Sequence, residues 1–164
     1  MGNLAALSLM TAILCGIWVE LSSALGLLGW AGFAGCTAFF AAGGKIQGLK
    51  SSLPATLSGV FWAMVIIKMC NYMEFSHVAG ISTALITFIM CIQAKIKLFE
   101  FIPGTFIGSF STFASGGDWK GVVITLILGA ILGYACESSG TWFYNVTNRN
   151  TNSQEKDTKE QEAV

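Results

Sequence analysis

The sequence predicts an all-α, polytopic membrane protein with about six transmembrane helices. Apolar residues make up 54% of its 164 positions and charged residues 11%, whereas a soluble domain carries about 25% charged residues. Apolar runs of about 20 residues, the length that crosses a bilayer, recur from Leu4 to about Tyr144. Seven of the eighteen charged residues fall in the last sixteen positions. We therefore expect a transmembrane domain at 1–144 and a disordered, polar cytoplasmic tail at 145–164.

Short polar or glycine-rich breaks divide the apolar region into six spans. These are 4–25, 27–44, 53–73, 76–94, 101–117 and 119–142. Because the breaks are only a few residues long, neighbouring helices must run antiparallel. The second and fifth spans are short and rich in Gly, Ala, Ser and Thr, so each is either a full but thin helix or a re-entrant one. We expect no secretory signal, because the three residues before the first span carry no Lys or Arg and a second apolar run follows at once.

Lysine and arginine residues are unevenly distributed among the polar segments. Seven of them lie between spans two and three, between spans four and five, or after span six: Lys45, Lys50, Lys95, Lys97, Arg149, Lys156 and Lys159. The opposite breaks hold a single lysine, Lys120. The positive-inside rule then places both termini in the cytoplasm. Trp119 and Trp142, at opposite ends of span six, fit the aromatic residues that membrane interfaces favour.

Internal similarity suggests two related halves. Residues 33–49 and 106–122 share seven identities in seventeen positions at a constant offset of 73. This offset maps spans one to three onto spans four to six. Because three is odd, the second half would be inverted in the membrane, as in many transport folds. A rival alignment pairs 53–61 with 102–110 at an offset of 49, and chance matching of small residues is the third interpretation.

Two charged residues lie within the apolar spans. Glu20 is about six positions past the centre of the first span, roughly 9 Å by helical rise, and Lys68 is about five positions past the centre of the third. A lone charge in hydrocarbon costs several kcal/mol. Two arrangements avoid that cost: an ion pair between Glu20 and Lys68 at an outer vestibule, or a Lys68 that reaches the headgroups with Glu20 at the interface.

The segment 103–114, PGTFIGSFSTFA, contains most of the candidate functional residues. The candidates for a pore or substrate path are Thr105, Ser109, Thr112, Phe106, Phe113 and, as a counterpart on the second span, Thr37. The three hydroxyl residues of the fifth span recur at helical spacing, with phenyl rings on adjacent faces. The alternative is packing alone, because Gly104 and Gly108 form a G-x-x-x-G helix-contact motif.

Several functional classes find no support in the sequence. A net charge of zero argues against nucleic-acid binding. The five cysteines lie singly in apolar runs, which is typical of small packing residues rather than of disulfides or metal ligands: Cys15, Cys36, Cys70, Cys91 and Cys136. His77, the only histidine, lies near Glu74 in a predicted outer loop, where we expect it to be solvated rather than a proton sensor. No nucleophile–base pair, metal site or cofactor motif is evident, so we expect no enzyme and no cofactor.

The length, the six-span layout and the PGTFIGSFSTFA segment are similar to those of the YcdZ-like bacterial inner-membrane proteins, a domain of unknown function. The resemblance covers about residues 4–140 and rests mainly on 102–114. It implies a location in the bacterial inner membrane. It supplies no substrate and no catalytic residue.

Three functional hypotheses follow. The first is a small channel or transporter for a small, neutral or weakly polar solute, because a path lined by hydroxyls and phenyl rings with few charges suits such a solute better than an ion. With so little protein per chain, we expect a homo-oligomer in the lipid bilayer. The second is proton-coupled exchange that uses Glu20. The third, from a different class, is a non-transporting scaffold or accessory subunit whose small-residue faces bind a partner.

Overall fold

The computed structural model describes residues 2–73 and 77–161, with side chains up to residue 148. Within these ranges every regular element is helical, which confirms the predicted all-α class. The elements are α1 Asn3–Ala24, α2 Gly29–Ala41, α3 Lys45–Tyr72, α4 Val78–Ile92, the short 3-10 turns η1 Gln93–Lys95 and η2 Lys97–Phe99, α5 Ile102–Ala114 and α6 Trp119–Gln161. Glu74 lies outside the described residues.

Among the described residues, four helical segments are long and apolar enough to cross a membrane: Asn3–Ala24, Lys45–Tyr72, Val78–Lys95 and Trp119–Asn148. The other two helices, α2 and α5, have 13 residues each. At 1.5 Å per residue they measure about 20 Å, less than the roughly 30 Å of a hydrocarbon core. Four of the six predicted spans are thus supported by length and composition, and the second and fifth are short, as the sequence predicts.

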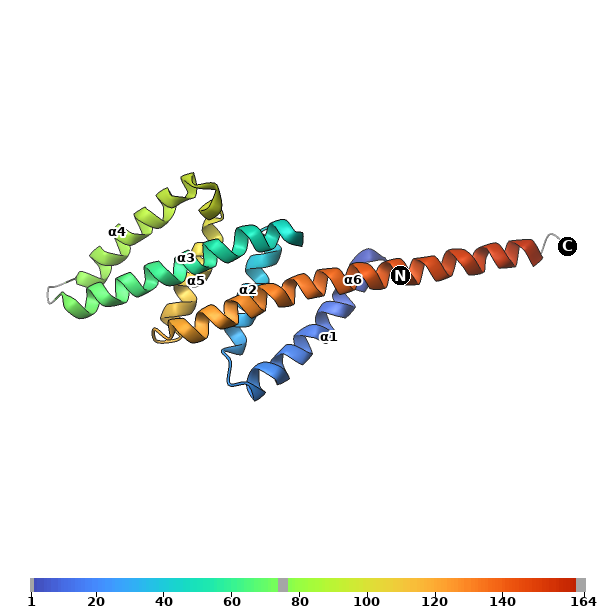
Figure 1. The fold of residues 1–164 in the computed structure, drawn as a ribbon, viewed down its shortest axis with the longest axis horizontal. Coiled ribbons are helices and arrows are strands. Elements are labelled where there is room, and N and C mark those ends of the chain that lie inside the picture. The colour runs from blue at the N-terminus through green and yellow to red at the C-terminus, as the bar shows by residue number, and fades with distance from the viewer. Residues whose placement is uncertain (1, 74–76, 162–164) are drawn as a thin grey trace.

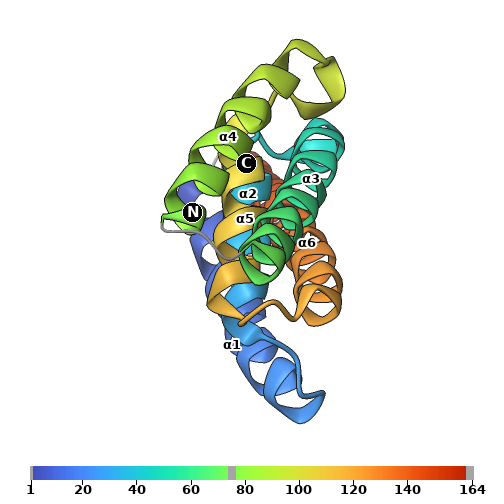
Figure 2. The same ribbon diagram turned by 90° about the vertical axis from the view of Figure 1, so that its left-hand side faces the viewer.

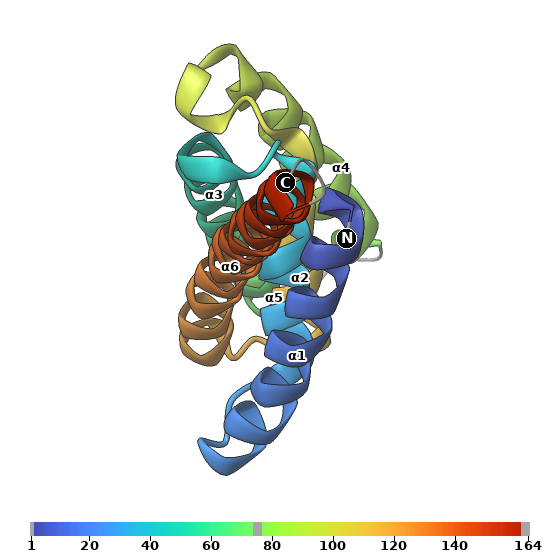
Figure 3. The same cartoon turned by 90° about the vertical axis from the view of Figure 1, so that its right-hand side faces the viewer.

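The helices form a layered bundle, in which α3 and α4 lie side by side and run in opposite directions (Figure 1). The long helices α3 and α6 run antiparallel, and the short helices α2 and α5 cross them. In Figure 2, α1 and α4 extend in opposite directions from the central α2 and α5. Figure 3, from the opposite side, shows α3 and α6 together on one flank of the bundle, away from α1 and α4. The two short helices therefore occupy the middle of the bundle.

Direct backbone contact holds the crossings together, and glycine makes it possible. A Cβ atom added to Gly108 of α5 would collide with the carbonyl oxygen of Thr56 in α3, and one added to Gly59 of α3 would collide with that of Thr105 in α5. Helices α2 and α6 are joined by a contact of the same kind, in which Gly35 of α2 lies against the backbone of α6. Such close approach maximises van der Waals contact where no hydrophobic effect drives helices together. The predicted packing role of the small residues in the fifth span is therefore met by Gly108.

The buried positions of the two halves correspond closely. The six buried residues of α2 recur in α5 at a constant offset of 73: Ala31, Gly32, Gly35, Cys36, Ala38 and Phe39 match Gly104, Thr105, Gly108, Ser109, Ser111 and Thr112. In α3 and α6 the offset is 70: Ser52, Ala55, Thr56, Gly59, Val60, Ala63 and Ile66 match the buried residues 122, 125, 126, 129, 130, 133 and 136. The buried faces of α2 and α5, and those of α3 and α6, thus have the same residue spacing.

Helix α3 differs from its predicted range. It begins at Lys45 rather than near residue 53, and Pro54 lies inside it. Pro54 thus lies in the interior of its helix, whereas Pro103 lies in the first turn of α5. An interior proline removes one backbone hydrogen bond and costs about 3 kcal/mol. The turns before it are nevertheless helical, with Gly48 and Ser52 buried against the rest of the bundle.

Helix α6 continues to Gln161, into the segment 145–164 for which the sequence predicts a disordered tail. An existing helix extends without the cost of a new nucleus, and residues such as Glu, Lys and Gln favour helix. The low apolar content that led to the prediction gives this extension no hydrophobic stripe with which to pack. It remains separate from the transmembrane bundle in Figure 1.

The start of α3 is tied to α6 by a carboxylate. Glu137 Oε2 accepts a hydrogen bond of 2.6 Å from the backbone N–H of Lys45. The chain reaches this point through Gly43 and Gly44, which have φ values of 95° and 66°, a conformation that glycine adopts without strain. The negative charge also faces the positive end of the helix dipole. Glu137 therefore caps α3 from another helix.

We expect Glu137→Ala to fray the first turn of α3 and to lower stability by about 1 kcal/mol, the usual value of a helix cap. Hydrogen exchange at residues 45–48 measures the fraying, and thermal unfolding in detergent measures the stability. Glu100→Ala is the matched control, because Glu100 is exposed and lies outside every α-helix. Unchanged exchange at 45–48 in the Glu137 variant would contradict the capping role.

Candidate functional site

A cavity between α4 and α5, with α3 as its floor, is the candidate functional site. Its volume is about 230 Å³. Hydroxyl groups and phenyl rings dominate its wall: it is lined by Ile66, Thr83, Thr87, Met90, Phe106, Ser109, Phe110 and Phe113. None of these residues is charged. The cavity is therefore apolar, uncharged and provided with a few hydrogen-bonding groups, which is typical of small-ligand sites.

A cluster of polar side chains lies beside this cavity, where the end of α4 meets α3 and α5. The Gln93 Nε2 group donates to Ser58 Oγ at 3.1 Å and to Thr105 Oγ1 at 3.2 Å. Gln93 Oε1 accepts a hydrogen bond of 2.9 Å from the indole N–H of Trp62. Ser58 is the fourteenth of the 28 residues of α3. The cluster thus lies halfway along a membrane-spanning helix and fixes the end of α4.

Three of the six predicted path residues line the cavity. Ser109, Phe106 and Phe113 do so, whereas the other three lie elsewhere. Thr105 is fully buried and belongs to the Gln93 cluster. Thr112 is also fully buried, and its hydroxyl donates to the carbonyl oxygen of Gly108 at 2.9 Å.

The sixth predicted path residue, Thr37, is exposed on α2, away from the cavity lining. The structure therefore groups half of the predicted residues in one site and distributes the rest among helix contacts and the surface.

Several residues of the site are not among the candidates that the sequence predicts. Thr83 and Thr87 lie one helical turn apart on α4, and this i, i+4 pair of hydroxyls on a predicted span was a detectable signal. Gln93 and Trp62 were harder to find, because they are 31 positions apart and meet only in the folded chain. An amide at the end of an apolar span is the one local indication that Gln93 offered.

The two intramembrane charges lie in separate grooves. Glu20 lines a shallow groove on the outer face of α1. Lys68 lines another groove, between α3 and α6. Both side chains are exposed, and no ion pair joins them in the described part of the chain. The ion pair, one of the two arrangements expected for these charges, is therefore not formed among the described residues.

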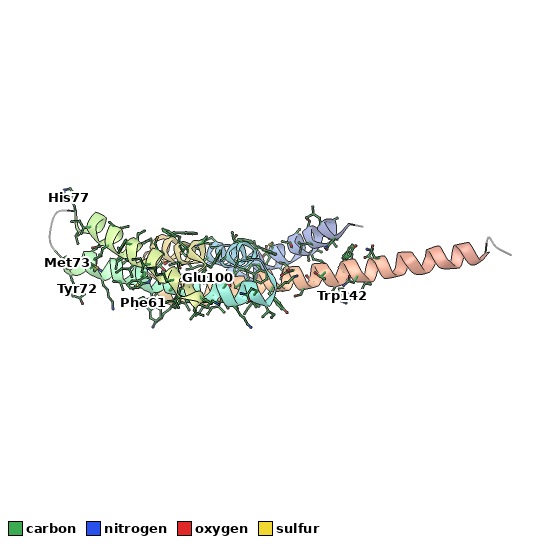
Figure 4. All side chains as sticks on the ribbon, turned by 90° about the horizontal axis from the view of Figure 1, so that it is seen from above. Phe61, Tyr72, Met73, His77, Glu100 and Trp142 are labelled. Carbon is green, nitrogen blue, oxygen red and sulfur yellow. The ribbon has the colours of Figure 1, made fainter. Side chains whose placement is uncertain are left out.

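Other polar side chains lie inside the bundle or at its end. Ser52, Ser82 and Ser111 are buried and have hydroxyl groups without a hydrogen-bond partner in the part of the chain that the structure describes. His77 is exposed and precedes α4 with a left-handed φ of 67°. Figure 4 places it at one end of the bundle, close to Tyr72 and Met73. The described residues contain no group of three or more His, Cys, Asp or Glu side chains that could hold a metal ion.

Apolar helices that turn their hydroxyls and amides toward one another define a polytopic integral membrane protein. The chain belongs to the family described as "Protein of unknown function (DUF1097)", whose model matches residues 8–141. This assignment confirms the family resemblance that the PGTFIGSFSTFA segment suggests.

Three relatives have a similar length, and two of them are named inner membrane proteins. The chain is 49% identical to "Inner membrane protein YcdZ" of Escherichia coli (strain K12) over 144 residues, 87% of this chain and 88% of the relative. It is 47% identical to the protein of the same name from Salmonella typhimurium (strain LT2), over 87% of this chain and 90% of the relative. It is 30% identical to "Uncharacterized protein YahC" of Escherichia coli (strain K12), over 85% and 92%. No solved structure matches the chain.

Proposed function

We propose that the protein is a small channel or transporter for a small, neutral or weakly polar solute in the bacterial inner membrane. The observation that carries this proposal is the uncharged cavity between α4 and α5, with its hydroxyl groups and phenyl rings. Its volume of about 230 Å³ is below the roughly 300 Å³ at which pockets for drug-sized ligands begin. Absence of a charged wall disfavours ions, because an ion that leaves water needs compensating charges or dipoles.

The internal correspondence supports a transport architecture. In the proposed arrangement all six helices cross the membrane, the second half is an inverted copy of the first, and α2 and α5 are its thin central helices. Equivalent buried faces in α2 and α5 and in α3 and α6 support the inversion. Transporters built this way bind their substrates between the halves, near the midplane. Both termini then lie in the cytoplasm, on the side with more lysines and arginines.

Solute flux into proteoliposomes tests the proposal. Stopped-flow light scattering would follow the entry of a panel of small neutral solutes, with glycerol, acetamide and urea as the first members. We expect at least one solute to enter wild-type vesicles at least tenfold faster than empty vesicles. Ser109→Trp fills the cavity and should reduce that rate to the level of empty vesicles.

The matched control is Ile81→Trp, which adds the same ring to the other side of α4, where Ile81 is 55% exposed. Its flux should equal that of the wild type. Equal melting temperatures of the two variants would show that Ser109→Trp acts through the cavity rather than through folding. If no solute or ion enters wild-type vesicles faster than empty ones, the transport proposal is wrong.

Proton-coupled exchange through Glu20 is the second transport hypothesis. It requires uptake that depends on pH and that loses this dependence in Glu20→Gln while passive flux stays unchanged. Glu20 lies on the outer face of α1 rather than in the cavity, so the first proposal has the stronger structural support.

The scaffold hypothesis draws on helix α1. Only Ala6, Trp18 and Ser22 of its 22 residues are buried, and a Cβ atom added to Gly16 would meet nothing within 4 Å. A helix this poorly covered offers a surface to a second copy or to another membrane protein. Stoichiometric co-purification with a partner, together with absence of flux, would favour a scaffold over a transporter.

A further inference from the structure

A second groove, distinct from the α4–α5 cavity, runs along the surface between α3 and α6. Its volume is about 330 Å³. Five of its lining residues, Leu57, Val60, Phe61, Met64 and Lys68, follow one face of α3 at helical spacing. Trp119 and Val123 form the opposite wall from the first turns of α6.

The groove has the length of one bilayer leaflet. Eleven residues separate its first and last positions on α3, which corresponds to about 16 Å of helical rise. Half of a roughly 30 Å hydrocarbon core is about 15 Å. The groove from Leu57 to Lys68 is therefore about as long as one leaflet. Its apolar part, from Leu57 to Met64, covers about 10 Å of an acyl chain that lies along α3.

Only one end of the groove is polar, and that end is cationic. Lys68 lies four residues before the end of α3, and its side chain is exposed, with no hydrogen-bond or ion-pair partner among the described residues. Lys120 lies beside the same end, with its Nζ 5.6 Å from the centre of the Trp119 ring. Asp118, which precedes Trp119 in the sequence, accepts a hydrogen bond of 3.1 Å from the backbone N–H of Gly121. It therefore caps α6.

We propose that this groove binds an anionic phospholipid, with its phosphate at Lys68 and Lys120 and one acyl chain along Leu57, Phe61 and Met64. Phe61 is 59% exposed and projects from the surface of α3 in Figure 4, where it would lie against the chain. A tryptophan and two lysines at the end of an apolar groove suit the headgroup region. The site stands apart from the transport proposal, since it shares no residue with the α4–α5 cavity.

Native mass spectrometry of the detergent-purified protein would test this site. The protein is mixed with equal amounts of phosphatidylglycerol and phosphatidylcholine that carry the same acyl chains. A lysine near an anionic headgroup contributes roughly 1 kcal/mol, about a fivefold change in affinity. We therefore expect wild type to retain phosphatidylglycerol preferentially. Lys68→Gln should reduce that preference about fivefold, and Lys68→Arg should preserve it.

Two further variants separate the groove from general attraction to anionic lipid. Lys97→Gln removes an exposed lysine outside the groove and should leave the preference unchanged. Val123→Trp fills the groove and should reduce retention of both lipids. The proposal is wrong if wild type retains both lipids equally, or if Lys68→Gln and Lys97→Gln have equal effects. It is also wrong if a second copy of the chain covers the groove. That outcome would be seen as a dimer that dissociates in both the Lys68→Gln and the Glu20→Gln variants.

Discussion

Gly108→Ala is expected to destabilise the protein by about 2–3 kcal/mol, the upper part of the range for overpacked interiors. The added methyl group would collide with the carbonyl oxygen of Thr56, which belongs to backbone and cannot turn away. The α3–α5 crossing would have to separate, and both the cavity and the Gln93 cluster depend on that crossing. Reversible unfolding in mixed detergent and SDS measures the loss.

Gly80→Ala is the matched control for this variant. A Cβ atom at Gly80 of α4 would meet nothing within 4 Å, so only the helix propensity changes. Alanine is favoured over glycine in a helix by about 1 kcal/mol, and we expect the control to be as stable as wild type or more so. Equal destabilisation by both substitutions would show that the α3–α5 crossing does not hold the fold together.

Gln93→Leu is expected to produce the second large effect, a loss of about 2 kcal/mol. The substitution leaves the indole N–H of Trp62 and the hydroxyls of Ser58 and Thr105 without the partner they share. Interhelical hydrogen bonds in membranes average about 0.6 kcal/mol each, and three lost together give the expected sum. Since Gln93 holds the end of α4 against α3 and α5, solute flux through the adjacent cavity should change as well.

A double-mutant cycle gives this prediction its internal control. Thr105→Val removes the hydroxyl and keeps the shape, so the double variant with Gln93→Leu should lose less than the sum of the single losses. Gln47→Leu makes the same replacement at an exposed position of α3 and should have little effect. Strict additivity, or equal losses from both glutamine substitutions, would rule out the cluster as a structural joint.

The sequence predicted those parts of the fold that depend on local composition. The apolar runs located α1, α4 and the membrane part of α6, and the small-residue content of spans two and five anticipated the two 13-residue helices. The G-x-x-x-G motif predicted the close approach that Gly108 makes, because contact between backbones requires residues without a side chain.

Features that depend on contacts between distant residues could not be predicted. The buried positions of α2 and α5 correspond at an offset of 73, whereas those of α3 and α6 correspond at an offset of 70. No single alignment without gaps can follow both. Gln93 was not predicted as a site residue, because its three hydrogen-bond partners come from the distant positions 58, 62 and 105. The site is therefore a property of the folded bundle and not of one motif.

Two tryptophans whose indole N–H groups are hydrogen-bonded can serve as fluorescence probes. Trp18 donates from Nε1 to the carbonyl oxygen of Gly29 at 3.0 Å, and Trp62 donates to Gln93 at 2.9 Å. One of them reports on the first half of the chain and the other on the contact between the halves. If the remaining three were replaced by phenylalanine, the tryptophan emission would have only these two sources. Rearrangement of one half relative to the other would then be visible in real time, without any attached dye.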